Sequence, residues 1–152
     1  MATKGDNSRK ELVKGLNGLL ADHFALYLKT KNFHWHVTGP RFHDLHLLFD
    51  AQAVEIQTQI DLIAERVRKN DSATLTSIGS IAKATQIEDQ DGKLDAEGMI
   101  RELQADNEKL VERLKGLKDA ADEAGDNATD GLLDDWTDQA EQRVWFLKSL
   151  LA

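Results

Sequence analysis

Apolar residues recur every three or four positions over most of this chain, which is the spacing that places side chains on one face of an α-helix. The first series consists of Leu12, Leu16, Leu19, Leu20, Phe24, Tyr27 and Leu28. Ser8-Arg-Lys-Glu11 precedes it and has the form of a capping box, in which the two outer side chains bond the first backbone amides. The pattern therefore predicts a helix from Ser8 to about His36, ended by Gly39 and Pro40.

A second series begins at Phe42 and predicts a helix that ends near Arg68. Its apolar positions are Leu45, Phe49, Ile56, Ile60, Ile63 and Val67. The next segment, residues 70–94, is mostly polar and is too long for a simple turn. Within it a short helix is predicted by the apolar residues Leu75, Ile78, Ile81 and Ala82.

The rest of the chain contains two further helical patterns. A heptad-like series from Asp95 predicts a third long helix that ends around Gly125. Its apolar positions are Met99, Leu103, Leu110, Leu114, Leu117 and Ala121. Asn127 or Thr129 is expected to cap a fourth helix. The apolar positions of that helix are Leu133, Trp136, Ala140, Val144, Leu147 and Leu151.

The lengths of the connections distinguish between the common types of four-helix bundle. Two helical hairpins joined by one long crossover are typical of the ferritin-like bundle, whereas an up-down-up-down bundle has short loops throughout. The sequence thus predicts an all-α fold, a ferritin-like four-helix bundle with a short extra helix in the crossover. We expect one such domain over residues 8–152, preceded by a short flexible tail at residues 1–7.

Composition and charge exclude several classes of function. The chain has 152 residues of which 41% are hydrophobic, enough for a core, and it has no cysteine for disulfides or thiolate metal sites. No segment resembles a signal peptide or a membrane span, so we expect a cytoplasmic protein without membrane contact. The net charge of −8 predicts weak or absent DNA binding, and a place at the nucleoid only if DNA is bound.

Side chains with metal-ligand chemistry share one face of the second predicted helix. With His46 at zero and about 100° per residue, Asp50 lies near 40°, Asp61 near 60° and Glu65 near 100°. The apolar residues of the same helix centre roughly 120° away from this face. Asp50 and Asp61 are separated by about 16 Å along the axis, at 1.5 Å per residue, so one ion cannot bind both.

Two copies of the helix, one from each of two subunits, could bring the separated ligands together. An antiparallel copy that crosses near Glu55 sets His46 opposite Glu65 and Asp50 opposite Asp61, which creates two identical sites about a two-fold axis. Taken one at a time, these residues are more simply explained as solvated side chains or as pairs that stabilise the helix. The motif Glu-x-x-His, which builds di-iron sites within a single bundle, is absent.

His34 is expected to lie level with His46, because the turn at residues 37–41 folds the first helix back along the second. One subunit would then supply His34, His46 and Asp50, and its partner Asp61 and Glu65. Imidazole and carboxylate ligands without sulfur suit iron or manganese, with Zn²⁺ as an alternative occupant.

The segment that begins at His34-Trp35, continues through His46 and Asp50 and ends in Asp61-Leu-Ile-Ala-Glu-Arg66 closely resembles the Dps family. These proteins are the mini-ferritins named DNA-binding proteins from starved cells. The resemblance implies a hollow homododecamer built from two-fold dimers, with a di-iron ferroxidase centre at each dimer interface. There Fe²⁺ would be oxidised to Fe³⁺, preferably by hydrogen peroxide, which protects against oxidative damage, and ferric mineral would be stored inside. The implied metal ligands are His34, His46, Asp50, Asp61 and Glu65.

Several other residues are candidates for supporting roles. The resemblance makes Trp35 a candidate redox-active neighbour of the site, although packing at the dimer interface explains it equally well. It also places a pore for iron near the start of the last helix, where carboxylates equally favour helix initiation. The candidate pore residues are Asp126, Asp130 and Asp134. His36 and His43 are expected to be solvated or to support the site, and His23 to face the interior.

Two other classes of function compete with this hypothesis. The main rival is a structural or DNA-compacting helical oligomer whose sites hold zinc or remain empty. A helical dimerisation module without metal is the third alternative, which the mirrored pairs of ligands disfavour.

Overall fold

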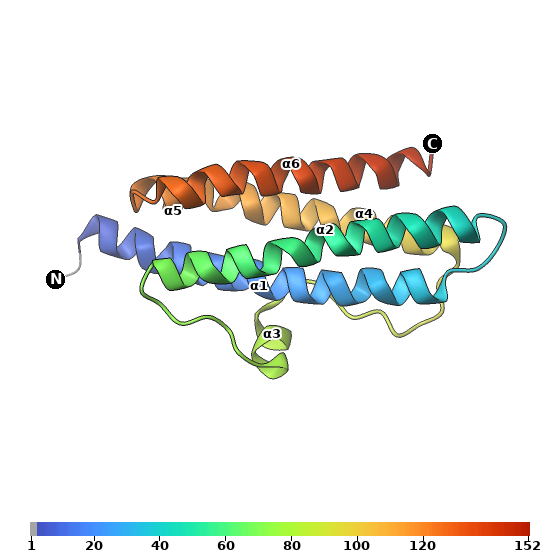
Figure 1. Cartoon of the computed structure of the whole chain (residues 1–152), viewed down its shortest axis with the longest axis horizontal. Helices are drawn as coiled ribbons and strands as arrows, with labels where there is room; N and C mark the ends of the chain where they lie inside the picture. The colour runs from blue at the N-terminus through green and yellow to red at the C-terminus, as the bar shows by residue number, and fades with distance from the viewer. Residues whose placement is uncertain (1–2) are drawn as a thin grey trace.

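A computed structural model describes residues 3–152 of the chain, which form helices and no strands (Figure 1). The helices are α1 (Lys4–His36), α2 (Phe42–Lys69), α3 (Ile78–Ala84), α4 (Ala96–Gly116), α5 (Lys118–Glu123) and α6 (Asn127–Ser149). The predicted all-α class is confirmed, and so is the short extra helix, α3, in the crossover. Within the same residues no helix is both long and apolar enough to cross a membrane.

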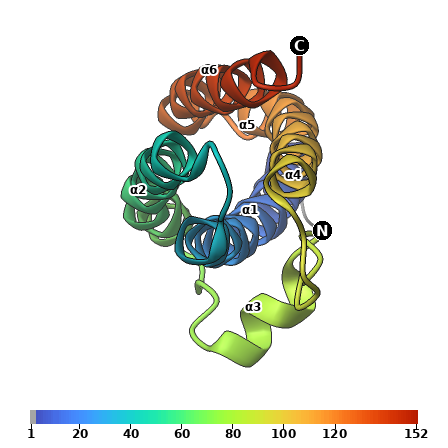
Figure 2. The same ribbon diagram turned by 90° about the vertical axis from the view of Figure 1, so that its right-hand side faces the viewer.

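Four long rods surround one core, as the end-on view in Figure 2 shows. They are α1, α2, α6 and the consecutive pair α4 and α5, while α3 lies outside the bundle beside α1. The predicted apolar series point inward, since residues such as Leu16, Phe49 and Leu110 are fully buried. Burial of these stripes holds the two hairpins together.

The first helix begins earlier than the sequence predicts. Thr3 caps α1, its hydroxyl accepts from the amide of Asp6, and the Asp6 carboxylate bonds the amide of Thr3 in return. Ser8 instead lies buried inside the helix and donates to Glu123 on α5 at 2.9 Å. The predicted start at Ser8 is therefore wrong, and residues 4–7 of the predicted tail are helical. Met1 and Ala2 lie outside the described residues.

The third predicted helix is divided in two at Leu117. There the backbone tightens, and the amide of Leu117 donates to the carbonyl of Leu114 at 3.2 Å. The Leu117 side chain fits against Gly15 of α1, where an added Cβ would lie 2.0 Å from a Leu117 methyl carbon. The expected end at Gly125 is confirmed, and its φ of +72° is a left-handed conformation that suits glycine.

The last helix is capped by Asp126, so the prediction of Asn127 or Thr129 as the cap is wrong by one to three positions. The Asp126 carboxylate accepts from the amide of Thr129 at 3.1 Å. It also accepts from Arg66 of α2 at 2.6 Å, a contact across the bundle. This second contact fixes the cap at Asp126, and local sequence could not reveal it.

A buried carboxylate, Asp22 of α1, is one of the side chains that fix the crossover to the bundle. It accepts from the Thr85 hydroxyl at 2.7 Å and the Gln86 amide at 2.9 Å, directly after α3. Arg113 of α4 donates to it at 2.7 Å. Because each oxygen of this buried charge has donors, its burial is compensated and the crossover is held against α1 and α4.

Candidate metal centre

Two histidines face each other where α1 ends and α2 begins. Gly39, at φ +108°, reverses the chain between the two helices. The rings of His34 and His46 stack with their centroids 3.9 Å apart and their planes 15° from parallel. The prediction that His34 lies level with His46 is thereby confirmed.

Each of these rings is held by the backbone of the other helix. His34 Nδ1 lies 2.6 Å from the His46 carbonyl oxygen, and His46 Nδ1 lies 2.8 Å from the His34 carbonyl oxygen. A carbonyl oxygen can only accept, so both Nδ1 atoms carry the hydrogen. In the neutral form of each ring this leaves the lone pair on Nε2, which is the tautomer that a metal ion requires.

Asp50 lies one helical turn after His46 and adds a carboxylate to the pair. Its Oδ1 is 3.8 Å from His34 Nε2 and accepts from Lys31 Nζ at 2.7 Å. The hydrogen bond from Lys31, together with its positive charge, lowers the pKa of Asp50 from its ordinary value. The carboxylate is therefore ionised at neutral pH, as a metal ligand must be.

Asp61 and Glu65 lie further along α2, exposed on the surface of the chain. Among residues 3–152 no cluster of three or more His, Asp or Glu side chains is arranged to hold a metal ion within one chain. The structure thus brings His34, His46 and Asp50 together and leaves Asp61 and Glu65 apart from them. Their convergence across two subunits stays a prediction.

Apolar side chains are exposed around the candidate ligands. On α2, Leu47 and Val54 are 53% and 48% exposed, and on the helical wheel they share the face of His46 and Asp61. On α1, Leu28 and Trp35 are 61% and 56% exposed and lie on the face that carries Lys31. Exposed apolar side chains grouped on neighbouring helices are typical of a protein interface.

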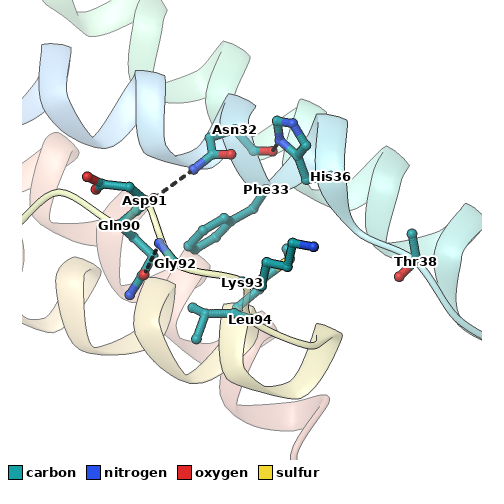
Figure 3. A pocket seen from close by; sticks show the side chains of 10 residues that line it. Asn32, Phe33, His36, Thr38, Gln90, Asp91, Gly92, Lys93 and Leu94 are labelled. Atoms are coloured by element: carbon teal, nitrogen blue, oxygen red, sulfur yellow. Dashed lines mark hydrogen bonds between the residues drawn. The ribbon is translucent and has the colours of Figure 1, made fainter.

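The remaining histidines have separate environments. His23 lies in the core of the bundle itself, where burial lowers its pKa to about 4. His36 is exposed, and its Nδ1 lies 2.8 Å from the Asn32 carbonyl oxygen. It lines a cavity of about 450 Å³ between the end of α1 and residues 90–94 of the crossover (Figure 3). Asp91 lines the same cavity, away from His36 in Figure 3. His43 is exposed at the start of α2.

The three candidate pore aspartates are bound to other side chains. Burial raises the pKa of Asp126, but hydrogen bonds from Arg66, Asn70 and Thr129 outweigh it and hold this pKa well below its ordinary value. Asp126 thus acts as the cap of α6. Asp130 and Asp134 both pair with Lys118, at 2.7 and 2.6 Å.

The sequence did not predict the ion pairs that three basic residues make with candidate site residues, namely those of Lys31, Arg66 and Lys118. For Lys31 a signal existed, because it precedes His34 by three residues and so lies on the same face of α1. Arg66 and Lys118 pair with residues far along the chain, and no local pattern predicts their partners.

Comparison with known proteins places the chain in a family. Residues 13–152 match the Ferritin family, described as the ferritin-like domain. The DNA protection during starvation protein of Brevibacillus brevis is 35% identical over 136 residues, which cover 90% of this chain and 91% of that protein. The structure of Dps from Thermosynechococcus elongatus superposes with a TM-score of 0.95 at 30% identity, over 99% of this chain and 96% of that one.

A third comparison concerns chemistry. The Dps protein of Vibrio cholerae O1 is described as a member of a broad superfamily of ferritin-like diiron-carboxylate proteins. It superposes with a TM-score of 0.91 at 28% identity, over 96% of this chain and 92% of that one. With a matching family over nearly the whole length, close relatives and the same fold, this chain belongs to the Dps family of ferritin-like proteins.

Proposed function

We propose that this chain is the subunit of an iron-oxidising and iron-storing mini-ferritin. Fe²⁺ would bind between two subunits, be oxidised with hydrogen peroxide as the preferred oxidant, and be stored as ferric mineral in a hollow dodecamer. The observation that carries the proposal is the pair of crossed imidazole–carbonyl hydrogen bonds, which point the Nδ1 atoms of His34 and His46 at the backbone and leave Nε2 as the nitrogen that could bind a metal beside Asp50. Family membership supports it, and so does the diiron-carboxylate description of the Vibrio cholerae relative.

The complete site would require a second subunit. An antiparallel α2 from the partner would bring Asp61 and Glu65 of the partner subunit to His34, His46 and Asp50. Leu47 and Val54 are about half exposed in the single chain. Such a contact would be favoured because it buries their apolar area. The contact is isologous, so each pair of subunits would form two sites.

The ligand set fits the proposed chemistry. Neutral imidazoles and carboxylates suit Fe²⁺, and the negative carboxylates bind the more highly charged Fe³⁺ product more strongly. Two Fe²⁺ ions give one electron each to hydrogen peroxide, which takes up two protons and leaves as two water molecules. Because both electrons are transferred at one centre, no hydroxyl radical is released. Trp35 would either supply an electron to a stray oxidant or pack at the interface.

Iron oxidation by the purified full chain tests the proposal. Fe²⁺ is added without oxygen, hydrogen peroxide follows, and ferric absorbance is recorded. We expect His46→Ala and Asp61→Ala each to slow oxidation by about 100-fold or more, because loss of a residue that only supports a metal ligand already costs about 10- to 100-fold. The matched control is His43→Ala, which removes an exposed histidine one turn before His46 and should leave the rate unchanged.

Oxidation by the wild-type chain at no more than the protein-free rate would overturn the ferroxidase proposal. That result, with Zn²⁺ bound or no metal bound, would favour a structural or DNA-compacting oligomer. A mobility-shift assay at physiological salt then examines DNA binding, which the net charge of −8 opposes.

A further inference from the structure

Lys31 makes the shortest polar contact to the candidate ligand Asp50. Its Nζ lies 2.7 Å from Asp50 Oδ1, and its side chain is 20% exposed against 43% for Asp50. The ion pair joins α1 to α2 one turn before His34. Because Lys31 is partly buried and held by this pair, it belongs to the candidate site and not to the general surface.

The oxygen that Lys31 contacts is the one that faces the imidazole. Asp50 Oδ1 lies 3.8 Å from His34 Nε2, so a metal ion held by this histidine and this aspartate would bind that oxygen. Metal–oxygen distances are about 2.0–2.6 Å, and an ammonium group 2.7 Å from the same oxygen repels a divalent cation placed there. Lys31 and a metal ion therefore compete for one atom.

We propose that Lys31 is the internal counter-ion of Asp50 in the metal-free site and that metal binding displaces its ammonium group from this carboxylate. The inference rests on the proposed function, since it takes His34 and Asp50 as ligands. Two consequences of opposite sign follow. Lys31 weakens metal binding, because the metal must displace it. Lys31 also stabilises the metal-free contact between subunits, because it offsets the repulsion between Asp50 and the incoming Asp61 and Glu65 of the partner subunit.

A place exists for the displaced ammonium group. Lys31 Nζ lies 5.9 Å from the centre of the Trp35 ring, within the range of a cation–π contact, and Trp35 is one turn further along α1. Displacement from Asp50 frees the group to approach the ring. Trp35 fluorescence therefore reports the displacement without any redox chemistry.

Calorimetric titration of the assembled full chain with Zn²⁺, which has no redox chemistry, measures the competition directly. We expect Lys31→Met to lower the Zn²⁺ Kd by about two- to fivefold, the effect of removing a competing, partly exposed ion pair. Lys31→Arg keeps the charge and should stay within about twofold of wild type. Lys14→Met, which removes an exposed lysine from the same helix, should leave the Kd unchanged.

The stabilising effect of Lys31 on the metal-free contact between subunits can be measured independently of metal affinity. Without metal, Lys31→Met should dissociate into smaller species at higher protein concentration than wild type, as seen by light scattering during dilution. Added Zn²⁺ should change Trp35 fluorescence in wild type and less in Lys31→Met, with Trp35→Phe identifying the signal. A structural role for Lys31 would weaken metal binding and assembly together.

The outcomes separate the two proposals. Equal Zn²⁺ affinity in wild type and His46→Ala would overturn the candidate site, and the role of Lys31 with it. Loss of binding in His46→Ala, together with unchanged or weaker binding in a folded Lys31→Met, would overturn only the role of Lys31. Circular dichroism verifies that each variant is folded.

Discussion

Polar residues from four helices meet inside the bundle, where each requires a partner. Arg143 of α6 is 2% exposed, donates to Asn107 of α4 at 2.8 Å and pairs with Glu55 of α2. His23 of α1 has Nδ1 2.8 Å from the Leu19 carbonyl oxygen, to which a neutral ring can donate, and Nε2 beside the side-chain amide of Gln59. A buried charge without such partners would cost several kcal/mol, so these contacts fix which residues face one another.

His23 should make stability depend on pH. Burial lowers its pKa from 6.5 to about 4, so below pH 6.5 the unfolded chain binds a proton that the folded chain refuses. Stability therefore falls as the pH is lowered from 6.5 towards 4. Between pH 7 and pH 5 wild type should lose about 2 kcal/mol more unfolding free energy than His23→Gln, measured by urea denaturation. Parallel pH profiles for the two proteins would contradict this.

At the scale of elements, the helices are placed by contacts between residues far apart in the chain. Arg66 near the end of α2 binds Asp126 at 2.6 Å and the Thr129 hydroxyl at 2.8 Å, and so fixes where α6 begins. Leu117 separates α4 from α5 where Gly15 of α1 leaves room for it. The break in the third rod thus lies where Leu117 packs against α1 and directly after Gly116, a residue that weakens a helix.

The contact between α1 and Leu117 can be tested by adding one methyl group. In Gly15→Ala the new Cβ would lie 2.0 Å from a Leu117 methyl carbon, so this buried leucine must move. We expect a loss of about 1–3 kcal/mol of unfolding free energy, measured by chemical denaturation, because overpacking forces strained rotamers. The matched control is Gly5→Ala in the same helix, where the Cβ meets only the Thr3 hydroxyl at 3.8 Å. A loss of equal size in the control would refute the packing argument.

At the scale of the whole molecule, the isolated chain carries half of a candidate site at each of two places. His34, His46 and Asp50 gather at one end of α2, and Asp61 and Glu65 lie exposed further along it. Apolar residues between them, Leu47 and Val54 among others, are left uncovered. A two-fold contact would both complete the ligand sets and bury this surface.

Mixed subunits test this arrangement. The first variant, His46→Ala with Asp50→Ala, and the second, Asp61→Ala with Glu65→Ala, should each be inactive in iron oxidation. Unfolded together and reassembled, they should recover about one quarter of wild-type activity, because random pairing gives half mixed dimers with one intact site in two. Ferric absorbance measures the recovery. Sites contained within single chains would show none.

Much of the fold follows from local sequence. The three- to four-residue apolar periods, the glycines that end helices and the long polar crossover led to a ferritin-like bundle, since these signals act over a few residues. Helix ends were less predictable. Thr3-x-x-Asp6 and Ser8-x-x-Glu11 both have the form of a capping box, but only Thr3 caps the helix. The Ser8 hydroxyl instead bonds Glu123, which is 115 residues away in the chain.

The sequence by itself determined the helical periods and the shared face of His46, Asp50, Asp61 and Glu65, because helical geometry fixes the direction of residues on one helix. Only the tertiary structure decided that His34 stacks on His46, that their Nε2 atoms are free, and that Lys31 holds Asp50. These contacts join different helices, and their geometry depends on how the helices pack. Interactions between residues that are neighbours in the sequence do not determine this geometry.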